Sequence, residues 1–358
     1  MGILSTADRS QLARLGWKPV FQQQLAEHAA HLIPLRVIAV QRTGLTVTPL
    51  DGEVQEVAMG GKWFTRAVEE RPTVGDWVLL DPHTQAVEQV LARTSEIKRM
   101  SPGGVGDLQM IAANIDTAFV VTSCNSDFSI ARIERYLAVL LEAAIQPVVV
   151  LTKVDLLESP DDLDTYRDAL RDMAADVPVE CVNALQPETL LGLAAWCHAG
   201  QTIALLGSSG VGKSTLVNSL AGEQLQPTQA IRSDDDKGRH TTTHRSLHLL
   251  PQGGVILDSP GMREFQLADA QSGVSEVFAD IEDLARQCRF SDCAHTGEPG
   301  CAVAQAIAAG TLEARRLESF FKLQREAVYS SETVAQRHIR VRQFSKKVKA
   351  ASTRRKQR

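Results

Sequence analysis

The stretch Gly207-Ser-Ser-Gly-Val-Gly-Lys-Ser214 decides the fold of this chain, because it matches the phosphate-loop pattern G-x-x-x-x-G-K-[ST] in full. The apolar residues 202–206 before it predict a short buried strand, and residues 215–220 after it predict the start of a helix. Glycines in such a turn let backbone N–H groups point at phosphate oxygens, and the helix N-terminus adds the positive end of its dipole. A glycine- and serine-rich turn with a chance lysine is the alternative, and the flanking elements disfavour it.

The loop is expected to surround the α- and β-phosphates of a nucleotide with Gly207, Ser208, Ser209, Gly210, Val211, Gly212, Lys213, Ser214 and Thr215. Lys213 would reach the β- and γ-phosphates, and the hydroxyl of Ser214 would bind Mg²⁺. The predicted ligand is therefore a magnesium-bound nucleoside triphosphate.

A second motif, Asp258-Ser-Pro-Gly261, follows the apolar run 255–257, which predicts another buried strand. Asp258 would hold Mg²⁺ through water, and the backbone N–H of Gly261 would contact the γ-phosphate. Taken alone, Asp-x-Pro-Gly is an ordinary turn signal. Its place after a strand, in a chain that also has a phosphate loop, favours the nucleotide site.

The tetrapeptide Thr152-Lys-Val-Asp155 follows a third apolar run, residues 147–151, and indicates which base is bound. The Asp155 carboxylate can accept hydrogen bonds from N1–H and the 2-amino group of guanine, whereas adenine has neither donor. The stem of Lys153 can lie over the base. Thr152 stands where this motif usually has asparagine, which is expected to weaken one contact that braces the phosphate loop. The motif favours GTP over ATP.

The order of these motifs is unusual. An ordinary GTPase has the phosphate loop first and the base motif last, whereas here residues 152–155 precede 207–214, which precede 258–261. A fold whose ends are adjacent at the surface tolerates new chain ends. The order therefore predicts a circularly permuted α/β GTPase domain over residues 115–278. Its last motif runs directly into the C-terminal part, which could respond to the nucleotide state.

Three cysteines and one histidine follow in the pattern Cys288-x4-Cys293-x-His295-x5-Cys301. This is a ligand set of tetrahedral structural Zn²⁺, and it leaves no open position for chemistry. Disulfides are the alternative, but no signal peptide is visible and a phosphate-loop enzyme is expected in a reducing compartment. We expect a small α-helical zinc-binding domain over residues 279–330. The scattered cysteines, Cys124, Cys181 and Cys197, are expected to be small buried apolar residues.

The N-terminal third has a different character. Residues 36–100 show short alternating apolar runs separated by turn residues, which predict an all-β barrel of the OB type. Such barrels bind nucleic acid, so Trp63, Phe64 and Trp77 could stack on bases or belong to the core. Residues 1–35 predict a polar helical extension, and residues 101–114 predict a linker. No apolar run is long enough to span a bilayer.

Charge is unevenly distributed. The chain carries 38 Lys and Arg against 43 Asp and Glu, a formal net charge of −5. Ten of the basic residues lie in residues 337–358, which contain no Asp or Glu. A cationic arm on an acidic body favours a polyanionic partner such as RNA over a tail that only aids solubility. Residues 331–358 are predicted to form this basic helix or tail.

The succession of barrel, permuted GTPase domain, zinc domain and basic arm resembles the RsgA family, also called YjeQ or YloQ, over nearly the whole chain. Further matching stretches are Pro72-Thr-Val-Gly-Asp-Trp77, Lys237-Gly-Arg-His-Thr-Thr-Thr243 and Asp258-Ser-Pro-Gly-Met-Arg-Glu264. The resemblance implies a monomeric, cytoplasmic bacterial GTPase with no membrane partner. It would act late in maturation of the 30S ribosomal subunit, be stimulated by that subunit, and leave after GTP is cleaved to GDP. Barrel and zinc domain would contact 16S rRNA, with Mg²⁺ and one Zn²⁺ as cofactors.

The resemblance also assigns catalytic candidates. In residues 238–243, Thr241 or Thr242 would close on Mg²⁺ and the γ-phosphate. Ras-like GTPases orient the attacking water with a glutamine after the sensing glycine, where this chain has Met262. His240 could position that water once the 30S subunit orders its loop, or it could serve loop structure or RNA contact. A third base-contacting loop, usually Ser-Ala, would lie near Val182-Asn183-Ala184, and Asn183 departs from that pattern.

Two other functions remain open from the sequence. One is a nucleotide-gated RNA-binding module with incidental hydrolysis. The other is an ATP-dependent enzyme with a zinc ribbon, against which Asp155 argues because of its preference for guanine.

Overall fold

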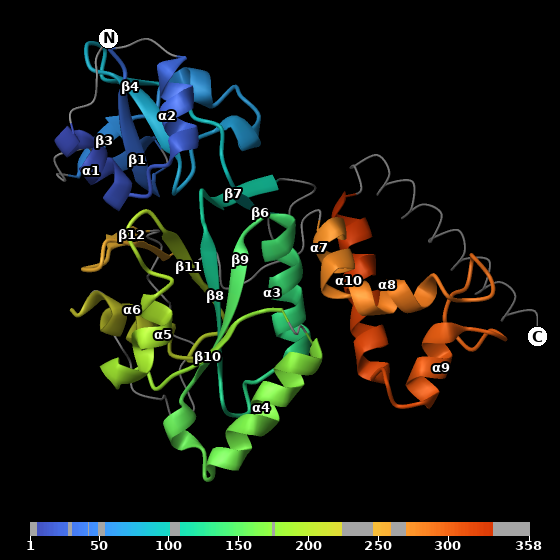
Figure 1. The fold of residues 1–358 in the computed structure, drawn as a ribbon. Coiled ribbons are helices and arrows are strands. Elements are labelled where there is room, and N and C mark those ends of the chain that lie inside the picture. The colour runs from blue at the N-terminus through green and yellow to red at the C-terminus, as the bar shows by residue number, and fades with distance from the viewer. Residues whose placement is uncertain are drawn as a thin grey trace, which may run out of the picture. The chain divides into compact units, whose positions relative to one another are not determined.

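The computed structural model describes residues 6–27, 31–41, 43–48, 54–100, 108–173, 176–223, 246–258 and 270–331. The chain divides into two compact units. Unit 1 comprises residues 1–98 and 110–265, and unit 2 comprises residues 99–109 and 266–358 (Figure 1). None of the described helices is both long and apolar enough to cross a membrane.

The N-terminal part of unit 1 is a five-stranded antiparallel sheet in the order β3-β2-β1-β4-β5. Its strands are β1 (Ile33–Val40), β2 (Gly44–Thr48), β3 (Gln55–Ala58), β4 (Trp77–Asp81) and β5 (Ala86–Val90). The edge strands β3 and β5 also approach one another. The sheet therefore curls. Because apolar and polar residues alternate along its strands, apolar side chains can line the inside of the curve.

Both faces of this sheet are covered. One face carries Leu35, Val37, Val47 and Trp63 in a common core. The other packs against α1 (Thr6–Arg14) and α2 (Pro19–Ala26) through a core that includes Trp77. The polar N-terminal extension is thus helical, and its few apolar residues seal this face.

The two tryptophans that could have stacked on bases are core residues. Trp63 and Trp77 are both 0% exposed, and the indole N–H of Trp63 donates to the Val87 carbonyl. Phe64 is 45% exposed. Of the three aromatic candidates, only Phe64 is accessible for stacking.

The second part of unit 1 is a six-stranded sheet in the order β10-β9-β8-β11-β13-β12. Its strands are β8 (Thr117–Ser123), β9 (Gln146–Thr152), β10 (Val179–Cys181), β11 (Thr202–Leu206), β12 (Ser246–Leu249) and β13 (Val255–Asp258). Neighbours from β10 to β13 are parallel, and β12 is antiparallel to β13. The central strands are continuous apolar runs because both faces of the sheet are covered.

Helices lie on both sides of this sheet (Figure 1). One face packs against α6 (Lys213–Ala221) and α5 (Leu191–Ala194) through Phe119, Val121, Leu193 and Leu216. Because side chains alternate along a strand, the other face of β8 and β9 is left for α3 (Ile130–Glu142), with α4 (Pro160–Met173) beside it. This is the layered arrangement expected of a phosphate-loop domain.

Buried polar residues join the two sheets of unit 1. Arg36, on β1, is 0% exposed and donates through Nη2 to the Asn114 carbonyl and the Thr202 hydroxyl, each at 3.2 Å. Burial lowers the pKa of Arg36 to about 10, which leaves it charged near neutral pH. Asp116 accepts the backbone N–H of Thr202 at 2.9 Å and pairs with Lys18. The N-terminal sheet is therefore fixed to the first residue of β11, the strand that leads into the phosphate loop.

The predicted linker 101–114 contains regular structure. Strand β7 (Leu108–Ala113) pairs with β6 (Glu96–Met100), because residues 108–113 are mostly apolar and residues 110–113 are buried. Residues 101–107 lie outside the described residues.

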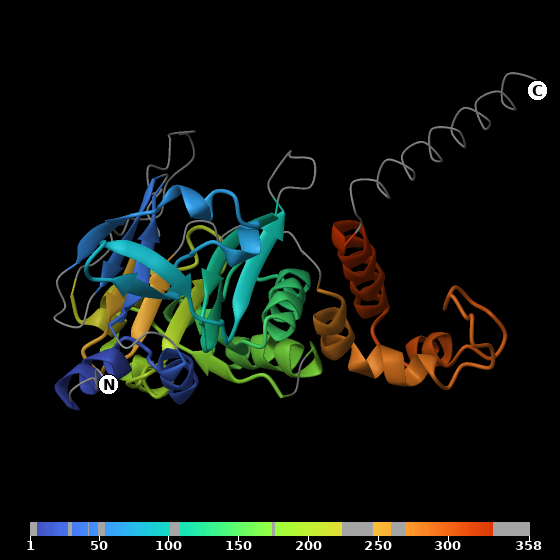
Figure 2. The same cartoon turned by 90° about the horizontal axis from the view of Figure 1, so that it is seen from above.

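Unit 2 contains four described helices: α7 (Gln271–Val277), α8 (Ala279–Ala285), α9 (Ala302–Ala308) and α10 (Ala314–Ser331), orange to red in Figure 2. Arg316, on α10, joins that helix to α7 and α8. Its guanidinium donates to both carboxylate oxygens of Asp280, at 2.7 and 2.8 Å, and to the Val277 carbonyl at 2.8 Å. It also lies 4.8 Å from the centre of the Phe278 ring. The basic segment beyond Ser331 lies outside the described residues.

Candidate nucleotide site and metal centre

Three predicted motifs begin at the same edge of the six-stranded sheet. Strand β9 ends at Thr152, β11 ends at Leu206 and β13 ends at Asp258, and these strands run parallel. The carboxyl ends of parallel strands meet at one edge, which is where ligands of such sheets bind. The topology therefore gathers motifs that the sequence separates by up to about a hundred residues.

The phosphate loop has the backbone that its glycines predict. Gly207, Gly210 and Gly212 have φ angles of 141°, 82° and 100°. A Cβ atom on Gly207 would lie 2.2 Å from the Val121 carbonyl oxygen, so no other residue fits there. Helix α6 begins directly after the loop at Lys213. In a phosphate loop, the N–H groups at the start of such a helix are the ones that can meet phosphate oxygens.

Lys213 is anchored on the loop itself. Its ammonium donates to the Gly207 carbonyl at 2.8 Å and to the Ser208 carbonyl. These contacts hold the ammonium charge on the loop and out of solvent. A phosphate group bound by the loop would meet the charge there.

Thr152 braces the phosphate loop directly. Its buried hydroxyl lies 2.6 Å from the Val211 carbonyl oxygen and 3.1 Å from that of Thr122. A Cβ on Gly212 would lie 3.7 Å from the same hydroxyl. The threonine hydroxyl thus supplies a hydrogen bond from the base motif to the loop, and the expected weakening relative to asparagine stays a prediction.

Replacing Thr152 by valine is expected to weaken GTP binding about fivefold, because an isosteric side chain removes one buried hydrogen bond worth about 1 kcal/mol. Thr152→Asn should restore most of the affinity, since an amide can donate to the same carbonyl. The dissociation constant for GTP, measured for all three proteins, tests this. Equal affinity of the valine variant and the wild type would contradict a bracing role.

The base motif presents an available carboxylate. Lys153 has a left-handed backbone with φ 59°, and residues Val154–Leu156 form a 3-10 turn after it. Asp155 lies in this turn, is exposed, and has no hydrogen-bond or ion-pair partner among the described residues. Asp155 follows Thr152, the residue that contacts the phosphate loop, by only three residues.

The third loop also lies beside the phosphate-loop helix. Ser219 of α6 donates to the Ala184 carbonyl at 2.6 Å. The side chain of Asn183 accepts the backbone N–H of Leu185 at 3.0 Å, which closes a local turn. Asparagine thus shapes this loop where serine is usual.

Several predicted site residues cannot be placed. His240, Thr241, Thr242, Gly261 and Met262 lie outside the described residues. Asp258 closes β13, and its backbone is described without its side chain.

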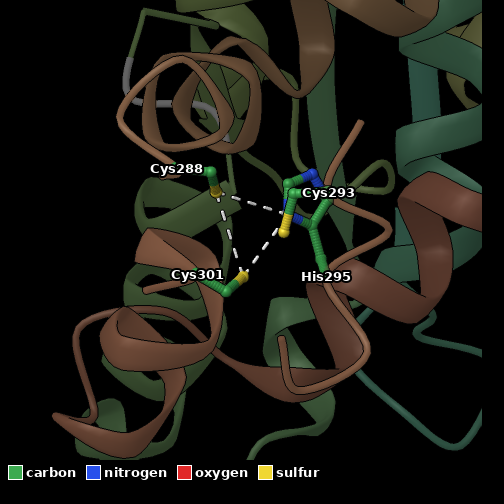
Figure 3. A group of neighbouring side chains, drawn as sticks. All are labelled: Cys288, Cys293, His295 and Cys301. Carbon is green, nitrogen blue, oxygen red and sulfur yellow. Dashed lines mark hydrogen bonds between the residues drawn. The ribbon is translucent and has the colours of Figure 1, made fainter. Parts of the chain in front are cut away.

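The four predicted metal ligands of unit 2 come together. Cys288, Cys293, His295 and Cys301 each offer one atom, and these atoms all lie within 4.8 Å of one another. Figure 3 shows their sulfur atoms and imidazole pointing toward a common centre. Sγ of Cys288 and of Cys301 lie 3.9 Å apart, and they lie 3.6 and 3.5 Å from Nδ1 of His295. The cluster can hold a metal ion.

These distances test which metal fits. Zinc bonds of about 2.3 Å to sulfur and about 2.0 Å to nitrogen, in a tetrahedron, separate two sulfurs by about 3.8 Å and sulfur from nitrogen by about 3.6 Å. The observed separations of Cys288, Cys301 and His295 agree with these values. The Sγ atoms of Cys288 and Cys301 also accept the backbone N–H groups of Ala302 and Ala304, each at 3.3 Å.

Glu298 shapes the loop that carries two ligands. Its carboxylate accepts the backbone N–H groups of Ala294 at 3.0 Å and Thr296 at 2.8 Å. The hydrogen bond from its own backbone N–H, followed by those from Thr296 and Ala294, lowers the pKa of Glu298 to about 2, so it is charged at neutral pH. His295, between these two residues, has a left-handed backbone with φ 58°. Spacing alone did not reveal this residue.

Two of the other cysteines are buried thiols, as expected. Burial raises the pKa of Cys124 to about 11 and that of Cys197 to about 12, so neither is a nucleophile near neutral pH. Cys181 is partly exposed, which the sequence did not predict. Among the described residues, none of the three belongs to a possible metal cluster.

Comparisons with known proteins agree with this site. A family model described as RsgA GTPase matches residues 90–268. The small ribosomal subunit biogenesis GTPase RsgA 2 of Vibrio vulnificus is 49% identical over 339 residues, covering 94% of this chain and 93% of that protein. The small ribosomal subunit biogenesis GTPase RsgA of Mesorhizobium japonicum is 47% identical, covering 90% of this chain and 91% of its own.

Solved structures share the fold. YjeQ from Thermotoga maritima superimposes with a TM-score of 0.61 at 26% identity, covering 83% of this chain and 99% of its own. YloQ, described as a circularly permuted GTPase, gives a TM-score of 0.59 at 22% identity, covering 85% and 99%. Fold and site together define a phosphate-loop GTPase whose motifs occur in circularly permuted order. This chain belongs to the RsgA GTPase family and is a GTP hydrolase.

A second family model, described as ABC transporter, matches residues 191–353. This range contains the phosphate loop, which ATP and GTP hydrolases share. It leaves out the base motif at Thr152–Asp155, so it does not bear on the choice of nucleotide.

Proposed function

We propose that this GTPase acts in late maturation of the small ribosomal subunit, and that the 30S subunit stimulates its hydrolysis of GTP to GDP. The contact between Thr152 and Val211, which joins the base motif to the phosphate loop in permuted order, carries the GTPase part of the proposal. The relatives named above are small ribosomal subunit biogenesis GTPases and match this chain over nearly its whole length. We place the protein in the cytoplasm as a monomer.

The proposed nucleotide site follows from the strand ends. Residues Gly207 to Thr215 bind the α- and β-phosphates, and Gly261 contacts the γ-phosphate. Ser214 and Asp258 bind Mg²⁺, whose charge would offset the negative charge of the phosphates. Thr152, Lys153 and Asp155 bind the guanine side of the site, supported by the bracing contact and the available carboxylate.

Proposed RNA contacts come from both units. We assign the curled five-stranded sheet to an OB-like barrel that contacts 16S rRNA. Phe64 is its exposed aromatic residue, and Lys62 and Arg66 lie 5.8 and 4.6 Å from the adjacent Trp63 ring. This combination of exposed ring and cations suits single-stranded RNA. In unit 2, a zinc-braced helical domain and the basic segment 331–358 would contact the same RNA.

The test is GTP hydrolysis with and without purified 30S subunits, with 50S subunits as the matched control. We expect a marked rise in turnover with 30S subunits only, because Met262 cannot orient water and a partner must complete the site. Equal rates in all three samples would rule out the ribosomal role and leave the nucleotide site unaffected. If His240 positions the water, His240→Ala should lose the stimulated rate and keep GTP binding.

The alternatives make different predictions. A nucleotide-gated RNA-binding module would bind 30S subunits differently with GDP, GTP and a non-hydrolysable analogue, yet would release from mature subunits without hydrolysis. An ATP-dependent enzyme would lose bound GTP to ATP in competition.

Replacing Asp155 by alanine is expected to abolish most of the preference for GTP over ATP, since the carboxylate accepts two guanine donors that adenine lacks. Competition titrations of the variant and wild type measure this preference. A variant that still discriminates as strongly as the wild type would place guanine recognition elsewhere.

A further inference from the structure

Arg132 lies against the phosphate loop, although no sequence motif pointed to it. It stands in the first turn of α3, which follows β8, the strand between β9 and β11. Its Nη1 atom donates to the hydroxyl of Ser208, the second residue of the loop. Ser208 lies 76 residues further along the chain. A cation is thus held at the same sheet edge as the proposed nucleotide site.

Asp127, which precedes α3, orients the guanidinium of Arg132. Nη1 also donates to the Asp127 carboxylate at 3.0 Å and to the Asp127 main-chain carbonyl at 3.2 Å. Side-chain exposures of 39% for Arg132 and 34% for Asp127 mean that water screens this ion pair, so it adds little to folding stability by itself. The contacts with Asp127 instead orient the Arg132 guanidinium, because two acceptors on one residue restrict the direction of the side chain.

The Arg132 guanidinium also has further N–H donors. Arginine has five N–H donors, and the hydrogen bonds of Arg132 to Asp127 and Ser208 all use Nη1. Among the described residues its Nε and Nη2 atoms have no hydrogen-bond partner. The guanidinium donates to the Ser208 hydroxyl of the same loop whose carbonyls accept the Lys213 ammonium.

We propose that Arg132 is a positioning residue for nucleotide binding, which acts through Ser208. It fixes the first half of the phosphate loop in its phosphate-binding form and adds positive charge beside the phosphates. This inference rests on the proposed assignment of residues 207–215 to the phosphates. It concerns the affinity for GTP and GDP, and the rate of the chemical step is set elsewhere.

The test is a double-mutant cycle on GTP and GDP affinity with Arg132→Ala, Ser208→Ala and the double variant. Arg132→Ala is expected to weaken both nucleotides about tenfold, the size of one charge-assisted hydrogen bond. Because both single changes remove the same bond, the double variant should be no weaker than the Arg132 variant. In hydrolysis, KM should rise with kcat nearly unchanged. Arg132→Lys should recover part of the affinity.

Controls separate this role from folding and from the nucleotide assignment. Arg171→Ala removes a cation from a 69%-exposed ion pair on α4 and should leave affinity unchanged. Arg132→Met keeps the side-chain stem, so a normal melting temperature with weakened GTP binding would exclude a folding defect. Wild-type affinity of Arg132→Ala, or effects of the two single changes that multiply, would overturn the inference. Failure of the wild type itself to bind GTP would instead refute the nucleotide assignment.

Discussion

Replacing Lys213 by alanine should lower GTP turnover by on the order of 100-fold or more, because the variant loses the cation that meets the charge developing on the β- and γ-phosphates. The structure already holds this ammonium on the loop through the Gly207 and Ser208 carbonyls. Removing one preorganised group of this kind typically costs two to three orders of magnitude in rate. Steady-state release of phosphate, with and without 30S subunits, measures the loss.

Folding must be intact for this result to be informative. Lys213 begins α6, and alanine is the best helix former, so the variant should retain the wild-type melting temperature. A matched control is Arg171→Ala, which removes an exposed cation from α4 and should leave the basal rate unchanged. Normal turnover of the Lys213 variant would show that the loop does not bind the transferred phosphate.

Removing the metal should unfold the loop between α8 and α9 in unit 2. Structural zinc sites bind with about 10–16 kcal/mol near neutral pH, which is as large as the stability of a whole domain. The intervening residues 286–301 contain no regular strand or helix, and Cys301 is their only buried residue. Metal ligation would therefore replace the hydrophobic core that this segment lacks.

Cys301→Ser is the sharpest variant for this test. The Cys301 Sγ atom accepts the Ala304 N–H at the start of α9, and a serine hydroxyl can cap a helix in the same way. Loss of the metal is then the main consequence. We expect the wild type to contain one zinc per chain and the variant none, with faster hydrogen exchange across residues 286–308. Basal GTP hydrolysis, which belongs to unit 1, should persist.

Cys181→Ser is the matched control, since Cys181 lies in unit 1 and outside the cluster. It should keep its zinc and its exchange pattern. Retention of one zinc by the Cys301 variant would contradict the assignment of that ligand, and a different metal in the wild type would contradict the choice of zinc.

Local patterns were enough to predict much of this protein. The glycines of residues 207–212 act on their own backbone, and the strands on either side of each motif are continuous apolar runs. Motif order along the chain is also a property of the sequence, so the permuted GTPase could be inferred before any contact was known. The four metal ligands lie within 14 residues, a spacing short enough to specify the cluster.

Other features depend on contacts between residues that are far apart in the chain, and local sequence patterns do not predict such contacts. Trp63 and Trp77 have the same chemistry as stacking aromatics, and only the two packed faces of the sheet make them core residues. Arg36 resembles any surface arginine in the sequence, yet it is buried between two sheets.

Residue patterns along the chain predicted the permuted GTPase fold and the Cys and His residues that come together in unit 2, because each pattern involves residues close together in the chain. Only the tertiary structure decided how the motifs support one another. The Thr152 hydroxyl meets the Val211 carbonyl across 59 residues, and Arg132 meets Ser208 across 76. Such contacts arise from the order of parallel strands in the sheet, which brings their carboxyl ends together at one edge.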